Sequence, residues 1–84
     1  MNNKQKKTLK AIFSNSVSPS IAWKDIEKLL IAAGCMIEEG RGSRVRIING
    51  DIFAVFHRPH PSKETDRGAV VSVREYLTKI GVKP

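Results

Sequence analysis

The sequence predicts a small α+β domain with the element order α-α-β-β-β-α. Near both ends of the chain, apolar residues recur with helical spacing, whereas in the middle they alternate with polar residues as in a half-buried strand. The dipeptide Asn49-Gly50 lies in the alternating region and is among the strongest short signals for a β-hairpin. With 84 residues, the chain is long enough for one compact domain and too short for a second.

Three segments have the pattern of amphipathic helices, at about residues 4–14, 24–33 and 67–80. The stretch SNSVSPS ends the first helix, Gly34 the second and Gly81 the third. The apolar stripes are Leu9, Ile12 and Phe13 in the first helix, Ile26, Leu29, Leu30 and Ala33 in the second, and Val70, Val73, Leu77 and Ile80 in the third. Trp23, at the entry to the second helix, is interpreted as a packing residue.

Three antiparallel strands are expected between the second and third helices, at residues 35–39, 44–48 and 51–57. Residues 40–43 form a Gly-rich turn between the first two strands, and Asn49-Gly50 forms a type I′ turn between the last two. Pro59 and Pro61 end the sheet because proline has no N–H to donate to a ladder.

If Asn49 and Gly50 form a two-residue loop, Ile48 faces Asp51 and the register of the hairpin follows. The other pairs are then Ile47 with Ile52, Arg46 with Phe53, Val45 with Ala54, Arg44 with Val55, and Gly42 with His57. One face, expected against the helices, carries Val45, Ile47, Ile52, Ala54 and Phe56. The other, expected to face solvent, carries Arg44, Arg46, Phe53, Val55 and His57. A slip of one residue would separate Phe53 and His57 from the arginines.

The charge of the chain favours a polyanionic partner. Lys and Arg number 15 against 8 Asp and Glu, so the net charge is +7, and it is spread along the chain. Nucleic acid is the leading class of partner. Cys35 is the only cysteine, which predicts no intramolecular disulfide and a reducing cytoplasmic location. The N-terminus lacks the apolar core of a secretory signal, no apolar run is long enough to span a membrane, and we expect no membrane partner.

Arginines beside an aromatic ring on an open sheet can hold phosphates while a base stacks on the ring. The alternative is that these arginines serve only solubility and that Phe53 is covered by Trp23 or by a partner. Each taken alone, His57 and His60 are ordinary surface or loop histidines. Together with the distant Cys35 they form a poor ligand set for zinc, so we expect no metal and no other cofactor.

Four segments, WKDIEKLLIAAGC, GRGSRV, FHRPHP and REYLTKIGVKP, occur in an order that resembles the HicA family of small toxins. The resemblance covers residues 21–84 and leaves residues 1–20 as an N-terminal helical extension. It implies an αβββα fold of the double-stranded-RNA-binding type, with helices on one face of the sheet. It also implies a toxin of a type II toxin–antitoxin system, an endoribonuclease that cleaves mRNA without metal and is neutralised by a HicB-like antitoxin.

In family toxins a catalytic histidine follows the Gly-Ser pair, whereas here Gly42 and Ser43 are followed by Arg44. Metal-free RNA cleavage needs a base for the 2′-hydroxyl proton, and a histidine, with a typical pKa of about 6.5, suits that role. Arginine stays protonated, so Arg44 can stabilise charge but cannot be the base. We therefore expect His57 or His60 to supply acid or base, with Arg44 and Arg46 on the phosphate. The remaining expected RNA contacts are Arg41, Gly42, Ser43, Phe53 and Arg58.

Three readings of function remain open from the sequence. The first is the ribonuclease toxin, the second is a non-catalytic RNA-binding module of the same fold, and the third is a basic domain that docks an acidic protein. An antitoxin is expected to cover the face of Arg44, Phe53 and His57 and so block substrate entry.

Overall fold

The computed structural model describes residues 1–15 and 20–84. Its helices are α1 (Asn3–Ile12), α2 (Trp23–Ala32) and α3 (Arg67–Lys79), and its strands are β1 (Met36–Glu39), β2 (Arg44–Asn49) and β3 (Ile52–His57). The predicted α+β class and element order are confirmed, and every element begins and ends within two residues of its expected bounds. Pro19, part of the stretch expected to end the first helix, lies outside the described residues.

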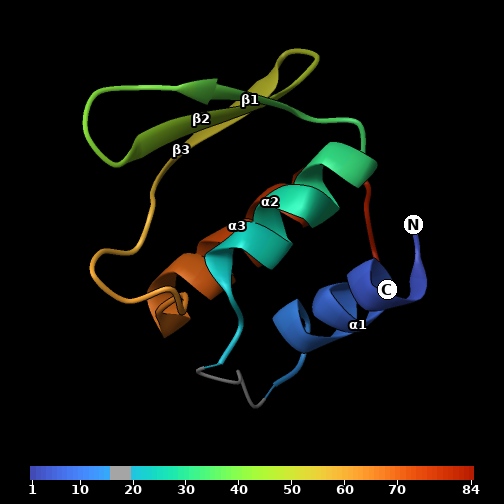
Figure 1. The fold of residues 1–84 in the computed structure, drawn as a ribbon. Coiled ribbons are helices and arrows are strands. Elements are labelled where there is room, and N and C mark those ends of the chain that lie inside the picture. The colour runs from blue at the N-terminus through green and yellow to red at the C-terminus, as the bar shows by residue number, and fades with distance from the viewer. Residues whose placement is uncertain (16–19) are drawn as a thin grey trace.

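The three strands form one antiparallel sheet in the order β1-β2-β3, and all three helices lie on the same side of it (Figure 1). α2 and α3 lie next to the sheet, and α1 packs against these two helices. The apolar stripes predicted for the helices face inward. The fully buried aliphatic side chains include Ile12, Ile26, Leu29, Leu30, Val45, Ile47, Val70, Val73 and Leu77.

The N-terminal helix α1 is part of this core. Leu9 and Ile12 are buried in the same apolar cluster as the side chains of α2 and α3. Arg74 of α3 fixes its C-terminal end, because the guanidinium donates to the carbonyl oxygens of Ile12 at 2.8 Å and Ser14 at 2.9 Å. Ile12 is the last residue of α1, and carbonyl groups at a helix end are stabilised by a basic side chain that donates to them.

Aromatic side chains join the sheet to the helices. Trp23 is buried, as expected of a packing residue, and its ring lies 5.7 Å from that of Phe56 in β3. Phe56 in turn meets Tyr76 of α3 edge to face at 6.5 Å. The Tyr76 hydroxyl donates to the carbonyl oxygen of Ile52 at 2.9 Å, with a longer contact to that of Ile47 at 3.4 Å. α3 therefore holds the hairpin through both packing and hydrogen bonding.

The predicted register of the hairpin is wrong by two residues. Asn49 pairs with Ile52, so the two-residue loop is Gly50-Asp51, and His57 pairs with Arg44 instead of Gly42. Gly50 has φ of +59°, while no other residue type among those described has positive φ. Glycine at the first loop position followed by a residue of negative φ fits a type II′ turn, not the type I′ turn expected. The reason is steric, because only glycine takes positive φ without a Cβ penalty and Asn49 is left in the strand.

A shift of two residues keeps every side chain on its expected face. Val45, Ile47 and Phe56 are buried against the helices, and Ala54 is partly buried. Ile52 is the exception on that face, since it is 37% exposed at the turn end of the hairpin. The expectation that Ile52 packs in the core is therefore wrong. The opposite face of the sheet remains as predicted, because side-chain direction depends on the parity of the register.

Candidate nucleic-acid interface

The face of the sheet opposite the helices is open and carries the five side chains predicted for it. Phe53 is 55% exposed and Val55 48% exposed, which is unusual for large apolar side chains on a folded domain. The other three are also exposed: Arg44, Arg46 and His57. On β1, Met36 and Glu38 belong to the same face, since they pair with Ile48 and Arg46. We refer to this surface as the open sheet face.

Arg46 and Phe53 form the centre of the open sheet face. The Arg46 guanidinium carbon lies 4.5 Å from the centroid of the Phe53 ring, within the range of a cation–π contact. A shallow hollow of about 310 Å³ beside them is lined by Glu38, Glu39, Gly40, Arg44, Arg46, Phe53 and Val55. The hollow thus combines two guanidinium groups with an aromatic ring, with two carboxylates at its β1 border.

Arg44 lies directly across the β2–β3 ladder from His57. Opposite side chains of an antiparallel pair have Cβ atoms about 4.5–5.5 Å apart, closer than in the expected register, where Arg44 pairs with Val55 and His57 is its diagonal neighbour. The start of β2 is held by the turn before it, because Gly40 N donates to Arg44 O at 2.8 Å and Arg44 N donates to Arg41 O at 3.1 Å. A Cβ on Gly40 would lie 3.1 Å from that same Arg44 oxygen, so the turn leaves little room for a side chain.

The Gly-Ser turn meets the loop that follows β3. Arg58 N donates to Ser43 O at 2.8 Å, which joins the two segments directly after the last pair of the ladder. A hollow of about 560 Å³ opens between them, lined by Gly42, Ser43, Arg58, Pro59 and His60. His60 is exposed there, and the peptide bond between His60 and Pro61 is cis. The structure thus gathers Gly42, Ser43 and His60 at one end of the sheet, next to the Arg44–His57 pair. Arg41 is exposed in the same turn.

Arg58, expected as an RNA contact, has its guanidinium on the helix side of the sheet. It donates to Glu27 of α2 at 2.7 and 3.2 Å and to Glu39 of β1 at 2.5 and 2.8 Å. Hydrogen bonds and charge from Glu39 and Glu27 raise the pKa of Arg58, and the hydrogen bond from Arg58 lowers the pKa of Glu39. We call this group the Arg58 clamp. With both edges of its fork engaged, Arg58 can meet a phosphate only by giving up one of its carboxylates.

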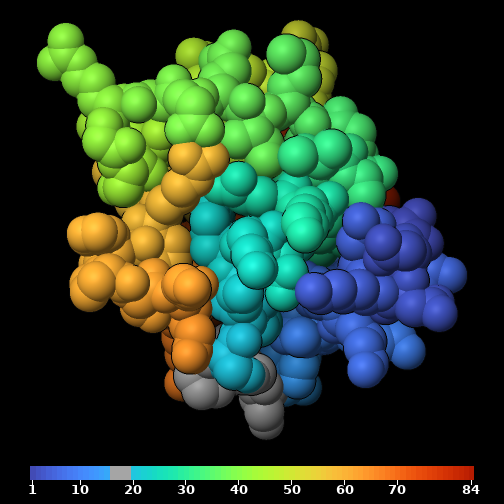
Figure 2. Space-filling view, viewed as in Figure 1, coloured from blue at the N-terminus to red at the C-terminus, as the bar shows by residue number. Residues whose placement is uncertain are grey.

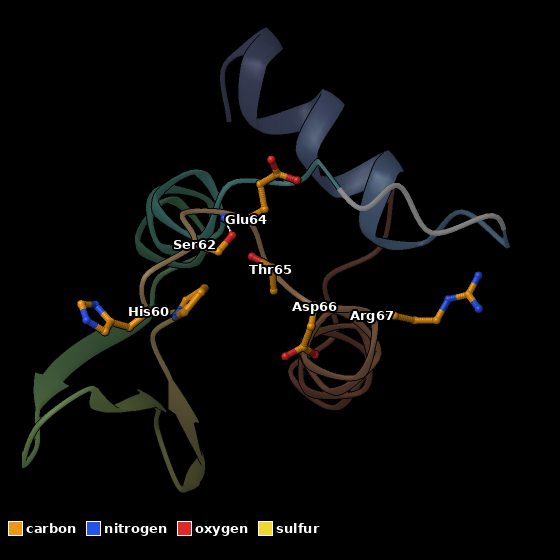
Figure 3. A pocket seen from close by; sticks show the side chains of 7 residues that line it. His60, Ser62, Glu64, Thr65, Asp66 and Arg67 are labelled. Atoms are coloured by element: carbon orange, nitrogen blue, oxygen red, sulfur yellow. Dashed lines mark hydrogen bonds between the residues drawn. The ribbon is translucent and has the colours of Figure 1, made fainter.

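A further hollow, of about 700 Å³, extends from the loop after β3 to the start of α3 (Figure 3). Its lining residues are Pro59, His60, Ser62, Glu64, Thr65, Asp66 and Arg67. Much of this lining serves local structure, because Ser62 accepts from Glu64 N at 3.0 Å and Asp66 caps α3 by accepting from Ala69 N at 2.8 Å. His60 borders both this hollow and the one at the Gly-Ser turn, and it is the only predicted site residue in the larger hollow.

Two features of this region were not predicted from the sequence. In the Arg58 clamp, Arg58 lies 31 positions from Glu27 and 19 positions from Glu39 along the sequence, and no local pattern indicates such a pairing. Tyr76 is buried at 3% exposure and could have been found, because it follows Val73 by one helical turn on the apolar stripe of α3. Burial is the main cause that raises the pKa of Tyr76 to about 12. Burial also raises the pKa of the Cys35 thiol.

A family model described as the HicA toxin of bacterial toxin–antitoxin systems matches residues 23–82. The match covers α2, the whole sheet and α3. The chain belongs to the HicA toxin family. A comparison with curated proteins found no match, and a comparison with solved structures found none. As a HicA toxin, the chain is one half of a toxin–antitoxin pair, so an antitoxin is its expected protein partner.

The matched region begins at the first residue of α2, so α1 lies outside it. The Gly-Ser turn, the open sheet face and both histidines lie inside. None of the helices in residues 1–15 and 20–84 has the length and apolar content needed to cross a membrane.

Proposed function

We propose that this HicA toxin is a metal-independent endoribonuclease that cleaves mRNA on the open sheet face. The observation that carries the proposal is the position of His57 directly opposite Arg44, beside the stacked Arg46 and Phe53. This arrangement offers an imidazole, two guanidinium groups and an exposed ring to one segment of a sugar-phosphate chain. We also propose that the toxin acts in the cytoplasm, where its mRNA substrate is found.

The reaction is an internal transfer of the phosphoryl group. The 2′-oxygen of the ribose attacks the adjacent phosphorus, a base accepts the 2′-hydroxyl proton, and the bond from phosphorus to the 5′-oxygen breaks. An acid then returns a proton to the leaving 5′-oxygen, which leaves a 2′,3′-cyclic phosphate on one product. General acid and base catalysis is worth about 10²–10⁴ in rate for such proton transfers. No electrons are transferred, and no metal is required for the balance.

His57 is proposed as the base, with Arg44 bound to the phosphate that it faces. The guanidinium remains charged, so it stabilises the negative charge that develops on the phosphorane oxygens. His60 is proposed as the acid, because it lies at the Gly42-Ser43 turn adjoining the start of β2. In the family the histidine after the Gly-Ser pair is expected to be catalytic, and here the imidazole stands on the facing strand instead.

The remaining contacts serve binding. We propose that a base stacks on Phe53, whose ring is already backed by the Arg46 guanidinium. Arg46 and Arg41 bind neighbouring phosphates, and the backbone of Gly42 and Ser43 lets the strand approach closely. Arg58 is proposed to hold the loop of His60 in place through its clamp, in place of the direct RNA contact expected from the sequence.

The test is cleavage of a long RNA by the purified chain in excess chelator. We expect wild type to release products with 2′,3′-cyclic phosphate ends, and the single substitutions H57A and H60A to slow cleavage by about 10²-fold or more. K79A removes an exposed cation at the end of α3 that lines neither the open sheet face nor the Gly-Ser turn, and as the control for a loss of surface charge it should cleave like wild type. Equal rates for wild type and the H57A/H60A double variant would rule out both histidines.

A second function, RNA binding without cleavage, is favoured by one observation. Arg44 occupies the position where the family resemblance expects the catalytic histidine, and arginine cannot act as a base at physiological pH. In that case the purified chain binds RNA with affinity that falls steeply with salt, while the RNA stays intact for hours. A slope of about −0.7 per phosphate contact is expected on single strands. A chain without such salt dependence would instead support docking of an acidic protein.

We further propose that the antitoxin covers the open sheet face. The exposed Met36, Phe53 and Val55 offer apolar area to a protein partner, and the arginines offer charge complementarity to acidic groups. A complex in which this face stays accessible to solvent would contradict the proposal.

A further inference from the structure

Helix α1, outside the region matched by the family model, is strongly basic. Four lysines lie within seven residues, and all four are exposed: Lys4, Lys6, Lys7 and Lys10. With Asn3 they line a surface hollow of about 650 Å³. A smaller hollow between α1 and α2 is bordered by Lys4 and Lys28, with Asp25 as the one acidic residue of its lining. The lysines occupy the side of the molecule formed by α1 in Figure 2, coloured blue.

The lysines stand where they oppose helix formation. The first turn of a helix favours negative charge, yet α1 has no acidic residue there and has Lys4 and Lys6 instead. Lys4 with Lys7 and Lys7 with Lys10 are like-charge pairs at i, i+3, and Lys6 with Lys10 is one at i, i+4. Among the described residues, the one ion pair that these lysines form joins Lys4 to Asp25 at 3.5 Å, and Lys4 is still 70% exposed. A solubilising face needs no such concentration of one sign.

The helix is held by other means, so its charge is free to serve binding. Asn2 and Gln5 form a capping box, in which Gln5 N donates to Asn2 at 2.9 Å and Asn2 N donates to Gln5 at 3.0 Å. Leu9 and Ile12 fix the other face in the core. α1 therefore presents its lysines on a rigid element.

The burial of the apolar stripe of α1 decides between two possible polyanionic partners, a membrane surface and a nucleic acid. A helix that binds a membrane surface inserts its apolar face between lipids. In α1 that face is not available, because Leu9 is 4% exposed and Ile12 is fully buried. What remains outward is charge alone, which suits the phosphates of a nucleic acid, bound without reading of sequence.

We propose that the lysine face of α1 is a second RNA-binding surface, which binds the phosphate backbone of the same mRNA that the open sheet face cleaves. The inference rests on the proposed function, since it takes RNA to be the partner. α1 lies on the helix side of the molecule, away from the open sheet face (Figure 1). Both surfaces can be occupied at once only by an RNA long enough to pass around a molecule whose largest extents are 31 and 30 Å.

The second surface adds affinity and leaves the chemical step unchanged. A long RNA held by α1 stays near the open sheet face, which raises its effective concentration there. The expected signature is a raised KM with unchanged kcat when the lysines are removed. A tetranucleotide spans only about 14 Å at the stacked spacing of about 3.4 Å per nucleotide, so it cannot reach both surfaces. Its turnover should therefore not depend on α1.

The test compares two variants that lose the same charge. K6Q/K10Q removes two lysines from one side of α1, and K63Q/R67Q removes two exposed cations from the loop before α3 and its first turn. The segment that carries these positions, from the loop after β3 to the start of α3, is coloured orange in Figure 2 and lies across the view from the blue α1. Glutamine keeps a helix propensity close to that of lysine, and circular dichroism should show both variants folded.

For K6Q/K10Q we expect the salt slope of binding to a 20-nucleotide RNA to fall by about 1.4, which is two contacts at about 0.7 each. The ratio of the wild-type affinity for this RNA to the affinity of K6Q/K10Q should therefore fall about sevenfold as salt rises from about 50 to 200 mM. The salt slope of K63Q/R67Q should differ from that of wild type by no more than about 0.4.

Equal slopes for K6Q/K10Q and K63Q/R67Q would overturn the second surface while leaving the proposed function in place. Vesicles of equal phosphatidylglycerol and phosphatidylcholine test the other polyanion. If K6Q/K10Q loses binding to these vesicles while its RNA binding stays intact, the second RNA-binding surface is overturned and the lysines are assigned to a membrane. Absence of RNA binding by the unaltered chain would overturn the proposed function itself.

Discussion

Removal of the Arg58 side chain should destabilise the fold mainly through Glu27. In R58A the Glu27 carboxylate, 19% exposed, keeps the Trp23 indole N–H as its one donor among the described residues, whereas the Glu39 carboxylate, 66% exposed, turns to water. A hydrogen bond to a charged group contributes about 1.5–3 kcal/mol, and an exposed ion pair about 0.2–1 kcal/mol. Because Arg58 itself is 33% exposed, we expect about 2 kcal/mol in total.

For a domain of this size, about 2 kcal/mol lowers Tm by roughly 8–16 °C. Thermal and urea unfolding followed by circular dichroism measures the change, with R67A as the control for loss of an exposed arginine. E27Q and E39Q form a matched pair, and E27Q should be the more destabilising. The reasoning is refuted if R58A lowers Tm by less than about 3 °C, or if E39Q costs more than E27Q.

The clamp also predicts the acid response of the protein. Arg58 lowers the pKa of Glu39 in the folded state, so this contribution to stability is present above the unfolded pKa and is lost as pH falls through the lower folded value. R58A should remove that part of the acid dependence, which urea unfolding between about pH 5 and 3 measures. An acid dependence identical to that of wild type would contradict the assignment.

Three further predictions concern other elements. Burial raises the pKa of Tyr76, the only tyrosine, to about 12, so stability should fall as pH rises from about 10 to 12, by up to about 1.4 kcal/mol per pH unit. Phenolate absorbance measures this directly, and Y76F should lack the effect; a folded-state midpoint near 10 would contradict it. F53A should leave Tm within about 3 °C of wild type, because the ring is exposed, yet weaken RNA binding about tenfold; unchanged affinity would exclude stacking on Phe53. G50A should cost about 1 kcal/mol because φ is +59°, while D51A, at negative φ, should cost less than half of that; equal losses would argue against the revised turn.

The open sheet face was predictable because it depends only on the alternation of side chains between the two faces of a strand. The expected pairing of Arg46 with Phe53 was wrong, yet both side chains kept their predicted face, since the error was an even number of residues. The turn itself was less predictable, because Asn49-Gly50 can occupy either of two positions in a two-residue loop. The choice of Gly50-Asp51 follows from the whole ladder, including the anchor from Tyr76 to Ile52.

Arg58 shows what sequence reasoning misses at the candidate site. The resemblance of the segment FHRPHP to family toxins leads us to expect Arg58 as an RNA contact. In the fold its partners come from α2 and β1, and long-range pairs of this kind leave no trace in residue spacing. In contrast, Arg41 and Arg44 are exposed as expected. Arg41 lies in the turn before β2 and Arg44 lies on the open sheet face, and both positions leave side chains in solvent.

The register found here also suggests how the chemistry of the family can persist without its expected histidine. The position after the Gly-Ser pair and position 57 are directly opposed on β2 and β3, with Cβ atoms at about 4.5–5.5 Å. If the open sheet face cleaves RNA as proposed, an imidazole on either strand would lie beside the same phosphate, and a guanidinium on the other strand would neutralise its charge. Such an exchange requires only that both positions stay on one face and in one pair. The variant R44H/H57R, which swaps the two groups across the ladder, should accordingly retain most of the cleavage rate that H57A loses. A swap variant as inactive as H57A would show that the two positions are not equivalent and that Arg44 does not share the site with His57.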